Sequence, residues 1–187
     1  MGGILSASAA SALMSGCKPS GAGLDLDWQP KFLTRLQGAN VREFAERIMP
    51  ATDTPGAKDA NVQEFIDLYL RDIYTEEEQK AVTDGLDELE AAAQDAHGMS
   101  FAQLTPEQMD ALMTEFAQKA VSNDKSVMEM RMPDGTPHWF ASLKEMTLVG
   151  FFSSEAGATQ VLQYEPVPGA YLGCEPLDTI GRTWATT

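Results

Sequence analysis

The sequence contains only two cysteines in 187 residues, Cys17 and Cys174, which excludes a disulfide framework and a four-thiolate metal site. A Cys-x-x-Cys-His segment is missing, so no c-type haem is attached to this chain. The glycine-rich loops that hold dinucleotides or nucleoside triphosphates are absent, as is the Gly-x-Ser-x-Gly turn of many hydrolases. We therefore expect no catalytic residue, and no cofactor or metal ion bound by this chain alone.

Basic residues are also scarce, with 13 Lys and Arg against 28 Asp and Glu and a formal net charge of -15. A phosphate backbone would be repelled, because no basic cluster offsets this charge locally. Nucleic acid is therefore excluded as a partner, and a basic protein surface is favoured. The 43% hydrophobic content is that of an ordinary globular protein, and the length fits one domain.

The first 17 residues carry no charged side chain and end in Leu13-Met14-Ser15-Gly16-Cys17. Small residues before a cysteine are typical of a lipobox, so residues 1–17 are interpreted as a signal-like segment with lipidation at Cys17. Residues 18–29 would then form a flexible tether. The alternative is an apolar N-terminal helix that packs on the domain or on a partner. No apolar run reaches the roughly 20 residues that a transmembrane helix needs.

The spacing of apolar residues predicts a mainly α protein, with a compact domain of about five helices over residues 30–152. The first helix is expected from Trp28 to Pro50, with a possible break near Gly38. Thr-x-x-Glu/Gln capping boxes mark the starts of the third and fourth helices. The last helix is apolar nearly all round, which predicts a central position. The expected second to fifth helices cover 62–73, 76–96, 106–122 and 139–150.

Regular structure is expected to end after Phe152, and residues 153–187 form a long irregular tail rich in Pro, Gly and aromatic residues. A tail of this length without secondary structure is usually functional or bound to something. Residues 126–136 are interpreted as a loop. If Cys17 is lipidated, Cys174 has no partner in this chain, and two alternatives remain open: a buried free thiol, or a disulfide to another subunit.

The remaining polar residues favour structural roles. His97 lies near a helix C-terminus, where the helix dipole favours a positive charge. His138 has no second ligand at metal-binding spacing. The carboxylates of the third helix are expected on a solvated face, and an independent enzyme would need His138, Glu145 and Glu155 to converge on a cleft. Met109, Met113 and Met146 are predicted core residues, whereas Met128, Met130 and Met132 are candidates for an interface.

Two long stretches of the sequence resemble the gluconate 2-dehydrogenase subunit 3 family, and the similarity covers most of residues 30–177. The first stretch is Ile48-Met49-Pro50-Ala51-Thr52-Asp53-Thr54-Pro55-Gly56-Ala57, continuing to Asp67. The second runs from Leu143-Lys144-Glu145-Met146 through Gly150-Phe151-Phe152-Ser153-Ser154-Glu155 to Tyr164-Glu165-Pro166-Val167-Pro168-Gly169, Tyr171 and Gly173-Cys174.

This resemblance implies a partner rather than an activity. Members of the family are small subunits of periplasmic sugar dehydrogenases whose large subunit is an FAD-containing protein of the glucose-methanol-choline (GMC) oxidoreductase type, often joined by a c-type cytochrome. The small subunit typically carries a twin-arginine export signal, and Gly2 to Gly16 resembles the apolar remainder of one, although the twin arginine itself is missing. We therefore expect export to the periplasm, membrane association through the Cys17 lipid, and FAD in the partner subunit.

The expected contact with the partner lies mainly in the tail, because rigid aromatic and Pro residues make good interface anchors. The runner-up interpretation is a freestanding periplasmic lipoprotein that binds a small ligand or acts as a tether. Such a protein should fold residues 153–187 over its own core, whereas a subunit should leave them disordered or aggregation-prone until the partner arrives. The turn residues Asp53, Thr54, Pro55 and Gly56 either serve the partner surface or only join two helices; the tail residues are Tyr164, Pro166, Pro168, Tyr171, Leu172 and Cys174.

Overall fold

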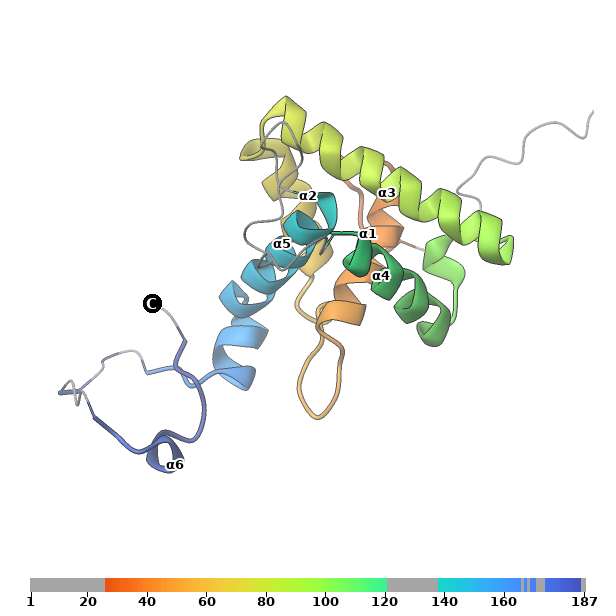
Figure 1. The fold of residues 1–187 in the computed structure, drawn as a ribbon. Helices are drawn as coiled ribbons and strands as arrows, with labels where there is room; N and C mark the ends of the chain where they lie inside the picture. Colours follow the sequence, from red (N-terminus) through yellow and green to blue (C-terminus); the bar gives the residue numbers. More distant parts are fainter. Residues whose placement is uncertain (1–25, 121–137, 166, 168, 171–173, 186–187) are drawn as a thin grey trace, which may run out of the picture.

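Five helices of eleven or more residues build the body of the protein in the computed structural model (Figure 1). The structure describes residues 26–120, 138–165, 167, 169–170 and 174–185. The mainly α fold class and the number of substantial helices are thereby confirmed. The helices are α1 (Arg35–Ile48), α2 (Val62–Asp72), α3 (Glu76–His97), the 3-10 turn η1 (Phe101–Gln103), α4 (Pro106–Ala120), α5 (Trp139–Ser153), the π-helix η3 (Gly157–Val161) and α6 (Leu177–Ile180).

Helix α5 is the centre of the body, as its apolar sequence predicts. It packs against α1, α2, α3 and α4, and the long helix α3 crosses the body above it in Figure 1. The three predicted core methionines are buried in this interior, which confirms their assignment. The fully buried large side chains are Val41, Phe44, Val62, Ile66, Leu70, Val82, Leu86, Leu89, Phe101, Leu143 and Phe151.

Local capping signals fix the starts of two helices and the end of one. Thr75 caps α3 and exchanges side-chain and backbone hydrogen bonds with Glu78, as its capping box predicts. Thr105 and Gln108 make the same reciprocal pair at α4. Gly98 ends α3 with φ at 69°, a left-handed conformation that glycine adopts without a steric penalty. The predicted boundaries of α3 and of the start of α4 are therefore confirmed.

The first helix begins later than predicted. Residues 28–34 are not helical, and Thr34 with Gln37 forms a capping box at the start of α1. The Asp67 carboxylate holds the preceding segment, because it accepts hydrogen bonds from the backbone N–H groups of Lys31 (2.6 Å), Phe32 (3.1 Å) and Leu33 (2.8 Å). The expected break at Gly38 is absent from this helix, which runs unbroken to Ile48.

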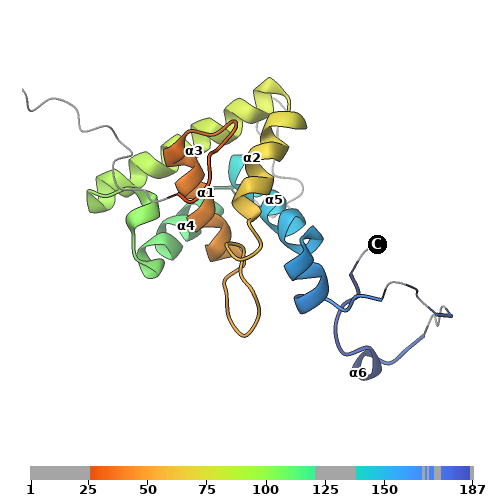
Figure 2. The same cartoon turned by 180° about the vertical axis from the view of Figure 1, so that it is seen from behind.

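The tail also differs from its prediction, because it contains helical turns. The π-helix η3 follows α5 almost directly, and the short α6 lies further along. Figure 2 shows the far half of α5 and the tail leaving the helical body at one end. The expected signal-like segment 1–17, most of the tether 18–29 and the loop 126–136 lie outside the described residues. Within the part of the chain that is described, no helix is long and apolar enough to cross a membrane.

Candidate partner-binding surface

The two ends of the tail are joined through Gln163. Its backbone pairs with the chain near Trp184: the Gln163 N–H donates to the Thr183 carbonyl (2.9 Å), and the Ala185 N–H donates to the Gln163 carbonyl (2.7 Å). The Gln163 side-chain amide donates to the carbonyls of Ile180 and Arg182. We call this junction of Gln163 with residues 180–185 the tail clasp.

A second bond and a glycine support the tail clasp. The Arg182 guanidinium donates to the carbonyl of Gln160 in η3 (3.2 Å), so the returning chain is tied to the helix that follows α5. Gly181 has φ at 75°, a left-handed conformation that lets the chain turn back after α6. The tail is therefore closed by its own hydrogen bonds.

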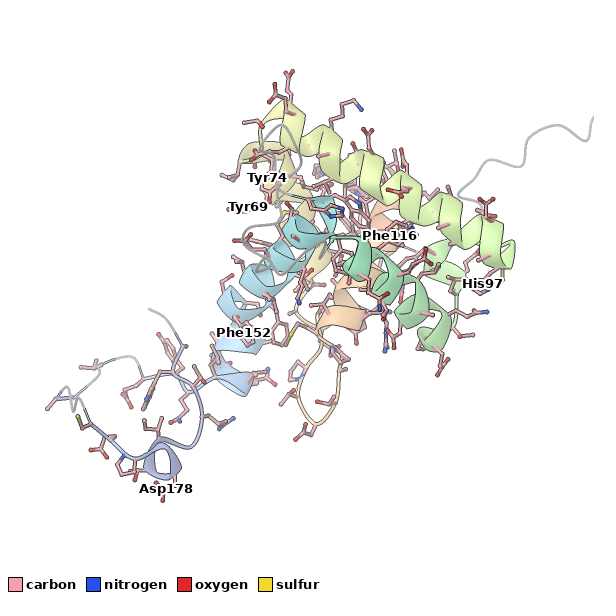
Figure 3. The ribbon with its side chains drawn as sticks, viewed as in Figure 1. Tyr69, Tyr74, His97, Phe116, Phe152 and Asp178 are labelled. Atoms are coloured by element: carbon pink, nitrogen blue, oxygen red, sulfur yellow. The ribbon has the colours of Figure 1, made fainter. Side chains whose placement is uncertain are left out.

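Large apolar side chains are exposed on both sides of the tail clasp. Tyr164 is 54% exposed, Val167 is 80% exposed and Trp184 is 53% exposed. Figure 3 shows Phe152 where α5 approaches the tail, and Asp178 on α6 pointing away from the helical body. Exposed aromatic groups held on a closed segment are suited to insertion into a second protein.

The structure resolves part of the predicted tail interface. Cys174 is a free, exposed cysteine, so the alternative of a buried free thiol is wrong, whereas the disulfide to another subunit stays a prediction. Tyr164 lies on the surface as expected. Cys17, Pro166, Pro168, Tyr171 and Leu172 lie outside the described residues, as do Met128, Met130 and Met132.

The loop between α1 and α2 is closed at its base by one carboxylate. Glu46 of α1 accepts hydrogen bonds from the backbone N–H groups of Ala51 and Lys58, each at 2.9 Å. The Ala57 N–H donates to the Met49 carbonyl at 2.8 Å. Glu46 therefore joins the two sides of the loop, which we call the Glu46 loop (residues 49–58).

The predicted turn residues divide between the tip and the base of this loop. Asp53 is exposed at the tip, while Thr54 and Pro55 are half-buried. Gly56 is buried at the base, where an added Cβ would stand 2.5 Å from the Ala51 nitrogen and 2.7 Å from a Glu46 oxygen. Gly56 is thus required for loop closure, and Asp53 is the exposed one of the four predicted turn residues.

The Glu46 loop and the tail project from the same end of the helical body in both views (Figures 1 and 2). His97, at the end of α3, lies on the side of the body away from the tail in Figure 3. Among the described residues, no hydrogen bond or ion pair joins the loop to the tail. Each of the two features is held by its own contacts.

The polar residues considered for catalysis do not converge. His138 caps the start of α5, Glu145 lies within this helix, and Glu155 follows its end. At 1.5 Å per residue, the helix separates His138 from Glu155 by roughly 25 Å. Within the described ranges, no group of three His, Cys, Asp or Glu side chains could hold a metal ion.

His138 has a structural role. Its Nδ1 accepts a hydrogen bond from the Phe140 N–H (3.2 Å), which caps α5, and its ring stacks on Trp139. Burial lowers the pKa of His138, and the Glu88 carboxylate opposes this shift only in part. His97 is exposed at the last residue of α3, with Nδ1 3.3 Å from the Gln108 amide nitrogen.

Sequence reasoning missed the role of Glu90, which was assigned to the solvated face of α3. Glu90 accepts hydrogen bonds from Asn40 of α1, Ser100 and the Phe101 N–H, and also from Gln94. Burial raises the pKa of Glu90, but these hydrogen bonds outweigh it and leave the pKa below its ordinary value. The contact joins Glu90 of α3 to the buried Asn40 of α1, so no local sequence pattern signals it.

A comparison with known protein families finds a match to this chain. The family model described as gluconate 2-dehydrogenase subunit 3 matches residues 35–169, which include α1 to α5, the Glu46 loop and the first part of the tail. No curated protein and no solved structure matches the chain.

Proposed function

This chain belongs to the gluconate 2-dehydrogenase subunit 3 family, and from this premise we propose that it is the non-catalytic small subunit of an FAD-dependent sugar or polyol dehydrogenase. Its partner is a GMC-type flavoprotein subunit that carries the FAD and selects the substrate. The small subunit stabilises this catalytic chain and assists its maturation and export. A c-type cytochrome subunit is a possible third component, because complexes of this kind often include one.

The proposal extends to the location of the complex. The resemblance of residues 2–16 to the apolar part of an export signal supports a periplasmic location, and the small residues before Cys17 support a lipid anchor. Both features lie in the part of the sequence outside the described residues. They are tested by mass spectrometry of the mature N-terminus, where a diacylglycerol on Cys17 supports the anchor and an unmodified Cys17 contradicts it.

The exposure of the tail is the observation that supports the proposal most directly. A freestanding lipoprotein should cover its own core with residues 153–187, but the described tail residues between 162 and 185 are exposed or half-buried. These residues form hydrogen bonds with one another and with η3. The described tail is closed by hydrogen bonds rather than disordered, which differs from the expectation for a subunit. It displays aromatic side chains instead of covering the core, and this exposure supports attachment to a second subunit.

The test is a pull-down of the tagged chain, with the tag placed between residues 18 and 23, from its native host. A stoichiometric second chain with flavin absorbance and dye-linked sugar oxidation would support the proposal and identify the substrate class. The same host producing only the tag serves as the control. A colourless, stable monomer would contradict the proposal and favour the freestanding lipoprotein.

A further inference from the structure

The tail clasp fixes the backbone of two exposed aromatic residues relative to each other. Tyr164 follows Gln163 directly, and Trp184 is the bridge partner of Gln163 in parallel pairing. The hydrogen bonds on either side of this bridge hold the backbone of residues 163–164 beside that of residues 183–185. Val167, the most exposed large apolar side chain among the described residues, lies three positions further on.

We propose that Trp184 and Tyr164, which extend from opposite faces of the tail clasp, insert as one preformed wedge into an apolar groove, bordered by Lys and Arg side chains, on the catalytic flavoprotein subunit, with Val167 adding apolar contact further along the chain. We call these three side chains the tail anchor. This inference rests on the proposed function, because it takes the flavoprotein subunit as the partner. It adds Trp184 and Val167, which lie in the predicted partner-binding tail but were not among its named contact residues, as determinants of assembly.

Gln163 is the positioning residue of the tail anchor. A flexible tail would lose conformational entropy on binding, at a cost of about 0.5–1.5 kcal/mol for each rotamer-rich side chain that becomes fixed. The four hydrogen bonds of Gln163 to residues 180–185 order the backbone before the partner arrives. The anchor residues therefore meet the groove with much of this ordering already complete.

The charges around the tail anchor define the rim of the groove. Glu165, Glu175 and Asp178 are exposed, and the single cation of this segment, Arg182, donates to the Gln160 carbonyl. Three carboxylates against one guanidinium leave the segment acidic, as is the whole chain at -15. Basic side chains around an apolar groove would attract this surface and raise the association rate.

The first experiment maps the contact. A photo-crosslinking amino acid replaces Trp184, Tyr164 or, as a control, Met99, which is 41% exposed just beyond α3 at the far end of the body. The full chain is produced together with the flavoprotein that co-purifies with the wild type. Crosslinks from positions 184 and 164, but not from 99, to apolar residues of that flavoprotein would support the proposal.

The second experiment measures affinity with the two purified chains. Trp184→Ala and Tyr164→Ala should each weaken binding by about tenfold or more, which is the loss expected for an aromatic anchor. Met99→Ala should leave the affinity within about twofold, because surface substitutions outside an interface have small effects. The thermal unfolding midpoint of every variant should equal that of the wild type, since the tail anchor lies outside the core.

A third set of variants separates positioning from contact. Gln163→Met keeps a side chain of similar length and adds no charge, but it has no N–H to donate to the carbonyls of Ile180 and Arg182, so it weakens the clasp without removing an anchor. Its binding should weaken through slower association. The triple variant Glu165→Gln, Glu175→Gln and Asp178→Asn should associate more slowly than the wild type at low salt, and its rate should depend less on salt.

The outcomes distinguish the inference from the proposed function. If the wild-type chain binds the flavoprotein but the anchor variants bind equally well, the tail anchor is wrong while the subunit assignment stands. If the wild-type chain binds no flavoprotein, the proposed function fails and the inference fails with it. Weaker binding of the anchor variants together with unchanged Met99→Ala binding supports both.

Discussion

Gly85 of α3 lies directly against the indole ring of Trp139 at the start of α5. A Cβ added at Gly85 would stand 2.1 Å from Cγ of Trp139, well inside the contact distance of two carbon atoms. The ring is nearly buried and packs edge-on against Phe116 of α4 and Phe140. Glycine at this position lets α3 approach the central helix, so the packing of three helices depends on a missing methyl group.

The substitution Gly85→Ala should therefore destabilise the protein by about 1–3 kcal/mol, the usual cost of overpacking a core. The gain in helix propensity, about 1 kcal/mol for alanine over glycine, opposes this cost but is smaller. The measurement is urea unfolding followed by circular dichroism. In a Trp139→Leu background, where the ring is gone, the same change should be nearly neutral or stabilising; an equal loss in both backgrounds would contradict the packing argument.

The helices were predictable where local chemistry decides them. Thr75 with Glu78 and Thr105 with Gln108 are capping boxes readable within four residues, and Gly98 marks a helix end by its own conformational freedom. The same signal, Thr34 with Gln37, was present at α1 and was overlooked in favour of the apolar spacing from Trp28. The start of α1 at Arg35 was therefore predictable from the sequence.

Contacts between distant residues were not predictable from this single sequence. Asp67 meets its donors 34–36 residues away, and the Gln163 side chain meets carbonyls 17 and 19 residues away. The sequence neighbours of Asp67 and Gln163 are of the same kind as those around a solvent-facing side chain, so they do not signal these contacts. Of the candidate site, the sequence pointed to the segment, and the role of Tyr164 as a partner contact stays a prediction. The closure of the tail depends on contacts that no local sequence pattern signals.

The Asp67 carboxylate is predicted to hold the segment that leads into α1. Asp67 is only 1% exposed and accepts three backbone N–H groups. In Asp67→Asn, one oxygen becomes an amino group that cannot accept the Lys31 N–H, so we expect a loss of about 1–3 kcal/mol. Urea unfolding measures this loss, and hydrogen exchange at the amides of residues 31–33 should become faster.

Asp72→Asn, at the end of the same helix, is the matched control. Asp72 is exposed and pairs with the neighbouring Arg71, so its substitution should change the free energy of unfolding by less than about 0.5 kcal/mol. If Asp67→Asn were as mild as this control, the carboxylate would not be what orders residues 31–33.

His138 is predicted to make stability depend on pH. Burial lowers its pKa in the folded state, and only the unprotonated Nδ1 can accept the Phe140 N–H that caps α5. The unfolded chain takes up its proton near the ordinary pKa of about 6.5, before the folded chain does. Stability from this group is therefore complete above that pH and is lost as the pH falls through the lower, folded pKa.

The variant His138→Asn isolates this contribution, because an amide oxygen can cap the helix without titrating. Thermal unfolding midpoints of both proteins are compared from about pH 8 to about pH 5. The wild type should lose more stability on acidification than the variant, since the other titrating groups are common to both. Parallel pH profiles would show that the imidazole does not titrate with folding.

Glu46 is predicted to keep the Glu46 loop closed, and its effect should be local. The two carboxylate oxygens accept one backbone N–H from each side of the loop. In Glu46→Gln the amide has one oxygen, so one of these N–H groups loses its acceptor and the loop opens more often. Limited proteolysis should then cleave near residues 52–54 several-fold faster than in the wild type, because cleavage follows the population of the open form. Glu43→Gln, a change in the same helix as Glu46, is the control. It removes the ion pair of Glu43 with Lys58 but leaves both backbone hydrogen bonds to Glu46 in place, so its cleavage rate should match that of the wild type.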